Sequence, residues 1–307
     1  MSRVPDLREI PDLPHEIIQS ALEGDFVLFV GSGVSMLVDL PSWGSLAWKA
    51  LEDLRQKGFT NYSELEQLKS LDPKKQLSIA KNIASENDTN LDLRKHLSHD
   101  MKNIGIYSYL NRIGCVCVTT NYDELLSPSF QTKTDSSKTS YSITRISRGE
   151  EFHAGLLNEP GTVVHLHGVV SNPDTMILTT EEYLKHYDHP VVQNFLKELF
   201  EKKTVLFMGY GLDEAEILEH ILRRAGAQYI EEKRRFALQG FFISQDPLYR
   251  RLYAYYRESF GINLIGYIRD YKDYAQLEDI TKTWAEQIEV RPAALVDDLS
   301  FMDEVLK

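Results

Sequence analysis

Cysteine is scarce in this sequence, which has only Cys115 and Cys117 among 307 residues. The two lie two positions apart in an apolar run that predicts a strand, so they cannot easily form a disulfide with each other. We expect both to be small buried apolar side chains in a reducing compartment. Two cysteines also exclude a zinc site made of four thiolates.

Long apolar runs are also lacking, and no stretch approaches the length of a membrane-spanning helix. The first residues, Met1 to Asp6, lack the apolar core of a signal peptide. We therefore expect a cytoplasmic protein with no membrane contact. Hydrophobic residues at 42% and charged residues at 26% are typical of a soluble globular chain.

Positive charge is in deficit, with 34 Lys and Arg against 46 Asp and Glu and a net charge of -12. A surface that binds phosphodiester backbones needs clustered basic residues, so the sequence argues against direct nucleic-acid binding. The scattered histidines have no spacing typical of metal ligands, and we expect no metal site.

The stretch around which the sequence is organised runs from Phe26 to Ser35 and reads FVLFVGSGVS. Five apolar residues predict a buried strand of a parallel sheet, and the Gly-Ser-Gly that follows predicts a tight turn into a helix. Such a turn can place backbone N–H groups around a phosphate. Gly31 and Gly33 give only G-x-G, without the third glycine of the dinucleotide fingerprint, so a plain turn without a ligand is the alternative.

The remainder of the chain alternates between the periodicities of strands and helices. Residues 43–101 are mostly helical in pattern. They place more residues between the first two strands than a crossover connection needs, which predicts a helical insertion or small subdomain. Residues 292–307 form an acidic C-terminal tail. Overall, the pattern predicts one α/β domain over residues 1–307, with a Rossmann-like, doubly wound and mainly parallel sheet. The expected strands after the first are 115–120, 162–166, 176–178, 204–208, 238–243 and 263–267. The expected helices outside the insertion are 14–23, 104–112, 180–187, 190–202, 214–224, 247–260 and 279–289.

Four predicted strands end in short runs of small or polar residues, and parallel neighbours would bring these runs to one crevice. The runs are Gly31-Ser32-Gly33, Asn121-Tyr122-Asp123, His165-Leu166-His167-Gly168 and Gly209-Tyr210-Gly211-Leu212-Asp213. Each has a structural alternative: Asn and Asp can bond their own backbone, buried histidines are often structural, and glycines can simply make a turn. The crevice would be without function only if the structural alternative were correct for all four runs at once.

These runs, in this order over roughly residues 15 to 270, resemble the sirtuin-like superfamily of NAD-consuming proteins, and most closely its bacterial anti-phage NAD hydrolase domains. The resemblance implies that Gly31, Ser32, Gly33 and Ser35 bind the NAD phosphates. It places Asn121 and Asp123 near the nicotinamide ribose and makes His167 the catalytic base. The other binding positions that we expect around NAD are Thr120, His165, Gly209, Tyr210 and Gly211.

Departures from the deacylases of this family point to NAD cleavage without acyl transfer. The four-cysteine zinc module cannot be built, Pro41-Ser42-Trp43-Gly44 stands where deacylases have Pro-Asp-Phe-Arg, and His165 replaces a usual glutamate. The resemblance implies an NAD glycohydrolase that releases ADP-ribose and nicotinamide and depletes NAD in infected cells (abortive infection). A subunit that binds NAD or ADP-ribose without cleaving it is the alternative, and a deacylase ranks last. The expected partners are further copies of the chain and a separately encoded defence protein such as a HerA-like ATPase.

Overall fold

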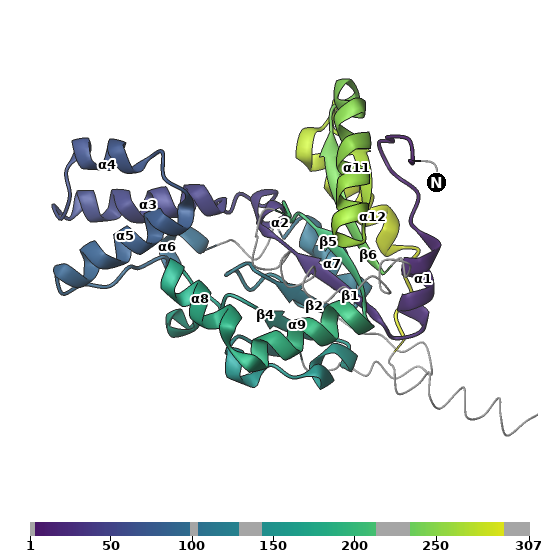
Figure 1. Ribbon diagram of the computed structural model, residues 1–307, viewed down its shortest axis with the longest axis horizontal. Helices are drawn as coiled ribbons and strands as arrows, with labels where there is room; N and C mark the ends of the chain where they lie inside the picture. Colours follow the sequence, from purple (N-terminus) through teal and green to yellow (C-terminus); the bar gives the residue numbers. More distant parts are fainter. Residues whose placement is uncertain (1–3, 99–103, 129–142, 213–233, 292–307) are drawn as a thin grey trace, which may run out of the picture.

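The computed structural model describes residues 4–98, 104–128, 143–212 and 234–291. Its centre is a sheet of seven described strands in the order β3-β4-β2-β1-β5-β6-β7, with every neighbouring pair parallel. The strands are β1 (Phe26–Val30), β2 (Val116–Thr119), β3 (Thr144–Ile146), β4 (Thr162–His165), β5 (Thr204–Met208), β6 (Arg235–Phe241) and β7 (Ile262–Ile268). The predicted Rossmann-like architecture is therefore confirmed (Figure 1).

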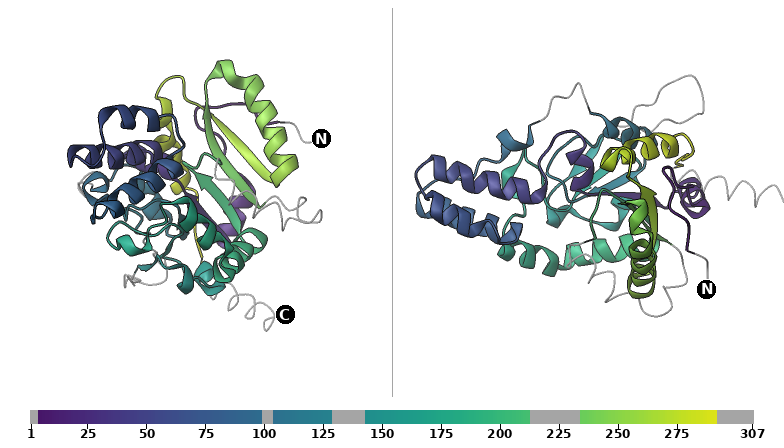
Figure 2. Two further views of the ribbon diagram at one scale, coloured as in Figure 1. Left: turned by 60° about the vertical axis from the view of Figure 1, so that its left-hand side comes forward. Right: turned by 90° about the horizontal axis from the view of Figure 1, so that it is seen from above.

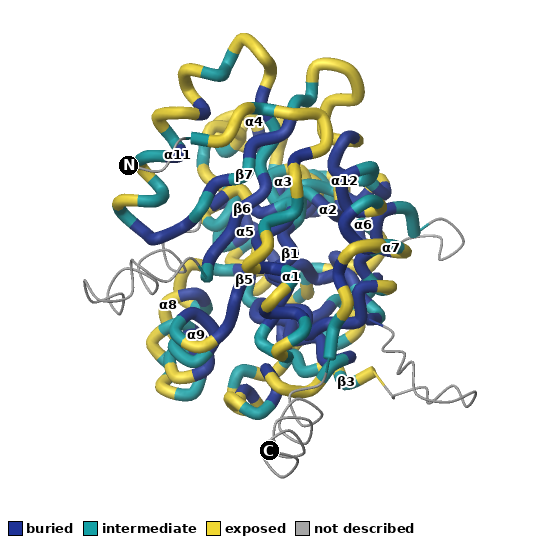
Figure 3. The backbone as a smooth tube through the Cα atoms, turned by 90° about the vertical axis from the view of Figure 1, so that its right-hand side faces the viewer, coloured by how far each residue is buried: buried dark blue, intermediate teal, exposed yellow. Residues whose placement is uncertain are grey.

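Helices cover both faces of this sheet, which explains why the central strands are apolar along their whole length. Side chains alternate between the two faces: Leu28 and Val30 of β1 join one core cluster, and Val27 and Phe29 join the other. The first face packs against α1 (His15–Leu22), α2 (Ser32–Met36), α7 (Ile106–Ile113) and α12 (Gln276–Ala285). The second packs against α9 (Pro190–Lys202) and α11 (Asp246–Phe260). Figure 3 shows the strands running through the buried interior.

The predicted helical insertion is present between β1 and β2. It contains α3 (Trp43–Gln56), α4 (Tyr62–Leu68), α5 (Pro73–Glu86) and α6 (Arg94–Leu97), with a core cluster of their own. Ser42, of a type that often caps helices, caps α3, because its hydroxyl accepts a hydrogen bond from the Ser45 N–H at 3.2 Å. These helices extend to one side of the sheet, away from α11 and α12 (Figures 1 and 2).

The prediction of a strand at residues 176–178 is wrong. This segment follows a 3₁₀ turn at Pro173–Thr175, and its backbone bonds to loops rather than to a strand. The Ile177 N–H donates to the His167 carbonyl at 2.9 Å, and the Tyr122 hydroxyl donates to the Ile177 carbonyl at 2.6 Å. Met176 and Leu178 gave the segment its apolar character because they pack into the core of the insertion.

Other boundaries differ from the predictions by a few residues. The strand expected from 238 begins at Arg235, and the helix expected from 279 begins at Gln276. Asp12, whose residue type and place before the predicted helix at 14–23 favour a cap, does not cap α1, because Pro14 holds that position without a side-chain bond. The short edge strand β3 was not predicted. The predicted helix at 214–224 and the C-terminal tail at 292–307 lie outside the described residues, as do residues 131–140, whose polar composition predicts a loop.

Between β4 and α9 runs α8 (Thr180–Asp188), which contacts α5 of the insertion through Glu182. This carboxylate pairs with Lys81 and accepts from the N–H groups of Leu178 and Thr179, both at 2.9 Å. Its side chain is 26% exposed. Burial acts to raise the pKa of Glu182, but the bonds to Lys81, Thr179 and Leu178 outweigh it and lower the pKa.

We expect Glu182→Gln to reduce the free energy of unfolding by about 1 kcal/mol at pH 7, because the amide keeps an acceptor but loses the charge. A carboxylate with a lowered folded-state pKa stabilises fully above its ordinary pKa of 4.5, and that contribution is lost as the pH falls from there through the folded-state pKa. Urea unfolding of both proteins at pH 7 and near pH 3 checks this. A difference that stays constant between the two pH values would contradict the assigned role of the charge.

Among the described ranges, no helix has both the length and the apolar character needed to cross a bilayer.

Candidate functional site

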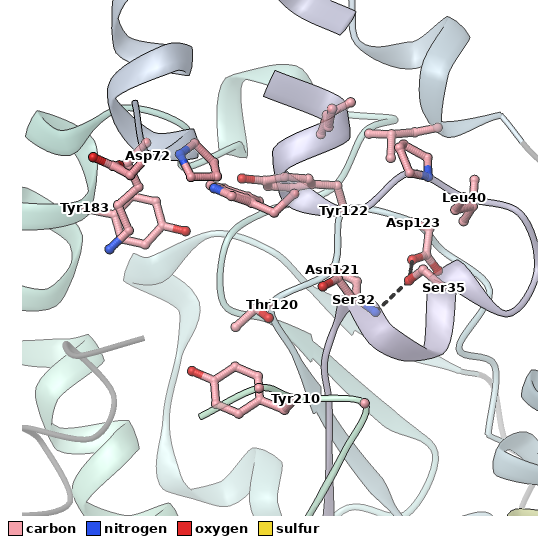
Figure 4. A pocket seen from close by; sticks show the side chains of 18 residues that line it. Ser32, Ser35, Leu40, Asp72, Thr120, Asn121, Tyr122, Asp123, Tyr183 and Tyr210 are labelled. Atoms are coloured by element: carbon pink, nitrogen blue, oxygen red, sulfur yellow. Dashed lines mark hydrogen bonds between the residues drawn. The ribbon is translucent and has the colours of Figure 1, made fainter. Parts of the chain in front are cut away.

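The four strands that end in the predicted polar runs are consecutive neighbours in the sheet, in the order β4-β2-β1-β5. Because all are parallel, their carboxyl ends lie at the same edge. A cavity of about 610 Å³ opens there, within the size range of small-molecule sites (Figure 4). Eight of the predicted site residues line it: Ser32, Ser35, Thr120, Asn121, Asp123, Gly209, Tyr210 and Gly211. The other four, Gly31, Gly33, His165 and His167, do not line this cavity.

The glycine turn after β1 packs directly against the turn after β5. The N–H of Gly31 donates to the Met208 carbonyl at 3.0 Å, and the N–H of Gly33 donates to the Gly209 carbonyl at 2.8 Å. A Cβ at Gly31 or Gly33 would lie 2.6 or 2.7 Å from the Gly209 oxygen. These two glycines therefore allow a close backbone approach, and their N–H groups bond within the fold. The parts of the turn that face the cavity are Ser32 and Ser35.

Asn121 follows β2, and its side-chain amide is held in one orientation. Nδ2 donates to the Gly31 carbonyl at 3.1 Å and to the Ser35 Oγ at 2.8 Å. The backbone N–H of Asn121 donates to the Thr119 hydroxyl at 3.0 Å. Oδ1 is buried and has no hydrogen-bond partner within the described part of the chain. Because both Nδ2 donors are used, the amide oxygen remains as a buried acceptor in a side chain that lines the cavity.

Asp123 is fixed behind Ser35 by a buried network. The Ser35 hydroxyl donates to Asp123 Oδ2 at 2.7 Å, and the Leu125 N–H donates to Oδ1 at 3.2 Å. The Tyr107 hydroxyl also donates to Oδ2 at 3.2 Å and lies 2.9 Å from Ser35 Oγ. Burial, followed by the charge of Asp123, raises the pKa of Tyr107 well above its usual value. Tyr107 therefore remains a protonated donor. Sequence reasoning missed it, because a tyrosine within α7 carries no motif.

His165 is the last residue of β4 and His167 follows the strand; both are fully buried, and neither lines the cavity. His165 Nδ1 lies 3.1 Å from the Asn121 carbonyl oxygen, so this ring supports the backbone of Asn121. His167 Nε2 lies 2.7 Å from the Tyr187 hydroxyl, and Nδ1 lies 3.2 Å from the Tyr183 hydroxyl. Burial lowers the pKa of both rings, and for His167 the charges of His186 and Lys74 lower the pKa further. Both rings are therefore neutral at pH 7, and each has one ring nitrogen that can accept a hydrogen bond.

Residues of the helical insertion cover the cavity from the opposite side. The lining includes Trp43 at the start of α3, and Asp72 with Lys74 at the start of α5. The Trp43 ring stacks on Tyr122 with centroids 5.5 Å apart and meets the edge of Tyr183 at 6.1 Å. Lys74 Nζ lies 4.3 Å from the centroid of the Tyr183 ring. The sequence gave no signal for these contacts, since they depend on how the insertion packs against α8.

Within the described ranges, no group of three or more His, Cys, Asp or Glu side chains is arranged to hold a metal ion.

The fold and the position of the cavity define a Rossmann-like domain with a cavity at the carboxyl ends of its strands. Residues 116–265 match the family model of the SIR2-like domain, a span that includes Asn121, Asp123, His167 and Gly209. This match confirms the sirtuin-like resemblance over these residues.

Two relatives carry names that describe a role. The chain is 28% identical over 277 residues to "Defense-associated sirtuin 2" of Bacillus subtilis, covering 86% of this chain and 25% of the relative. It is 23% identical over 223 residues to "NAD(+) hydrolase ThsA" of Bacillus cereus (strain MSX-D12), covering 72% of this chain and 44% of the relative. The chain thus spans less than half the length of each.

Proposed function

We propose that this chain is an NAD glycohydrolase, which cleaves NAD to ADP-ribose and nicotinamide. The single observation that carries the proposal is the fixed amide of Asn121, a residue that lines the cavity and whose buried Oδ1 has no partner among the described residues. A buried acceptor without a partner is costly, and a bound water or ligand hydroxyl would satisfy it. The name of the Bacillus cereus relative supports the same reaction.

Cleavage of the bond between nicotinamide and ribose passes through an oxocarbenium-like centre, and a water then forms the new bond to C1′. Asn121 Oδ1 would accept a hydrogen bond from that water or from a ribose hydroxyl, and so position it. Asp123 would contribute negative charge near the developing positive centre, since Ser35 and Tyr107 hold it in place. Ser32, Thr120 and the Gly209–Gly211 turn would contact the remainder of NAD. His167 would take the proton that the water loses.

A subunit that binds NAD or ADP-ribose without cleaving it is the second candidate. It is favoured by the burial of His167, whose two ring nitrogens both lie within hydrogen-bond distance of tyrosine hydroxyls. A base in this position does not contact a ligand in the cavity directly. We rank this candidate second because Asn121 Oδ1 is available as an acceptor. A deacylase ranks last, since two cysteines cannot form a four-thiolate zinc module.

We further propose that NAD cleavage serves anti-phage defence in the cytoplasm, on the model of the relative named for defence. Unregulated cleavage would exhaust the NAD of the host. We therefore expect control through self-association or a separately encoded partner such as a HerA-like ATPase, with the helices of residues 43–101 and the tail at 292–307 as the proposed interfaces.

The test is incubation of the purified protein with NAD, alone and with the products of neighbouring genes, followed by chromatography of nicotinamide and ADP-ribose. We expect both products in at least one assembly. Calorimetric binding of NAD without nicotinamide in every assembly would instead support the binding subunit. Absence of both binding and products would contradict both candidates.

A further inference from the structure

Tyr183 of α8 lies between the cavity and His167. Its side chain is only 2% exposed, yet it lines the cavity, whereas His167 is 0% exposed and does not (Figure 4). The Tyr183 hydroxyl lies 3.2 Å from His167 Nδ1, and the ring centroids are 4.8 Å apart. A proton that moves between the cavity and His167 therefore meets the Tyr183 hydroxyl on its way.

The other side of the His167 ring restricts how it can be protonated. Nε2 lies 2.7 Å from the Tyr187 hydroxyl, the shorter of the two contacts. A neutral imidazole carries one N–H, so one nitrogen donates and the other accepts. If Nε2–H donates to the Tyr187 oxygen, Nδ1 accepts from the Tyr183 hydroxyl. In that tautomer the free electron pair of His167 faces Tyr183 and the cavity.

We propose that Tyr183 is the residue through which His167 acts on the substrate: the tyrosine hydroxyl takes the proton from the attacking water and passes its own proton to His167 Nδ1. This inference rests on the proposed NAD cleavage and adds a residue to it. The bond between C1′ and the nicotinamide nitrogen breaks, and its electron pair neutralises the ring cation. The water oxygen bonds to C1′, and its proton goes to the Tyr183 oxygen. After product release, the proton returns along the same path to solvent.

Two contacts from the insertion hold the Tyr183 ring in this position. Lys74 Nζ lies over the ring, 4.3 Å from its centroid, and the Trp43 ring packs nearly perpendicular to it with centroids 6.1 Å apart. The positive charge of Lys74 also favours the negative charge that the tyrosine oxygen carries during the transfer. Neither contact uses the hydroxyl. Tyr183→Phe should therefore keep the ring in place and remove only the transferring group.

The kinetic test compares Tyr183→Phe with Tyr187→Phe, whose hydroxyl bonds the same imidazole but lies outside the cavity lining. We expect Tyr183→Phe to lower kcat about 100-fold, the size typical of a lost proton-transfer group, with little change in KM or in Tm. Tyr187→Phe should lose less. Wild-type kcat in Tyr183→Phe, together with an inactive His167→Ala, would overturn the proposal. A wild-type protein that cleaves no NAD would instead contradict the proposed function itself.

A second measurement does not require turnover. Nitrogen NMR of histidine-labelled protein, with the His167 signals assigned by comparison with His167→Gln, reports which ring nitrogen carries the proton. The proposal predicts a protonated Nε2 and an unprotonated Nδ1 in the wild type. A proton on Nδ1 would overturn the proposal, because Tyr183 would then accept from the ring and could not pass its proton to it.

Discussion

Asn121→Ala is expected to lower kcat for NAD cleavage by about 100- to 1000-fold, the loss typical of removing one preorganised polar group at a reacting centre. The amide of Asn121 is oriented by the Gly31 carbonyl and Ser35 Oγ, and its buried oxygen has no partner among the described residues although the side chain lines the cavity. Alanine removes that oxygen and leaves its two former acceptors without their donor. Steady-state kinetics on the NAD-cleaving assembly measures the effect.

Asn111→Ala is the matched control for this substitution. The side-chain amide of Asn111 is also held by hydrogen bonds. Its Nδ2 donates to the Leu125 carbonyl at 3.0 Å, and its Oδ1 accepts from the Ser127 N–H at 2.7 Å. It does not line the cavity. We expect it to lower stability by about 1 to 3 kcal/mol while kcat of the folded fraction stays near that of the wild type. Equal losses of kcat in both variants would show that Asn121 acts only through the fold.

Gly209→Ala is expected to reduce the free energy of unfolding by about 2 to 4 kcal/mol. Gly209 has a φ of 60°, and a Cβ there would lie 2.5 Å from the backbone nitrogen of Val34. Neither backbone can retreat easily, because the Gly33 N–H already donates to the Gly209 carbonyl at 2.8 Å. The added methyl group would therefore push apart the turns that follow β1 and β5.

Gly58→Ala is the control that separates the cost of the Cβ clash from the cost of placing alanine at a positive φ. Gly58 also has a positive φ, 80°, but a Cβ there would meet nothing within 4 Å. We expect a loss of about 1 kcal/mol, which is the cost of the left-handed conformation alone. Urea denaturation of the wild type, Gly209→Ala and Gly58→Ala measures the loss in free energy of unfolding for each variant. Equal destabilisation at the two positions would contradict the close packing of the glycine turns.

The sheet was largely predictable because its central strands are short apolar runs that end in small or polar residues. Phe26 to Val30 and Thr204 to Met208 were predicted with the bounds that the structure has. The segment 176–178 was mistaken for a strand, since apolar residues that pack into the insertion give the same pattern as a strand. The three-residue edge strand β3 is only partly buried and too short to produce a periodic signal.

The candidate site was predictable only where it follows strand ends. The runs after β1, β2 and β5 all contribute to the cavity, because parallel strands bring their carboxyl ends together. Tyr107, Lys74 and Tyr183 reach the site from helices whose packing no local pattern encodes. The position of His167 below Tyr183 was equally hidden, since it depends on how α8 folds back over the exit of β4.

The most direct test of the account is the stoichiometric release of nicotinamide and ADP-ribose from NAD by the wild type, with Asn121→Ala and Asn111→Ala measured in the same assembly. The account predicts equal amounts of the two products from the wild type and from Asn111→Ala, and nearly none from Asn121→Ala. Cleavage by Asn121→Ala at the wild-type rate would contradict it, because the amide oxygen at the cavity would then have no part in the reaction.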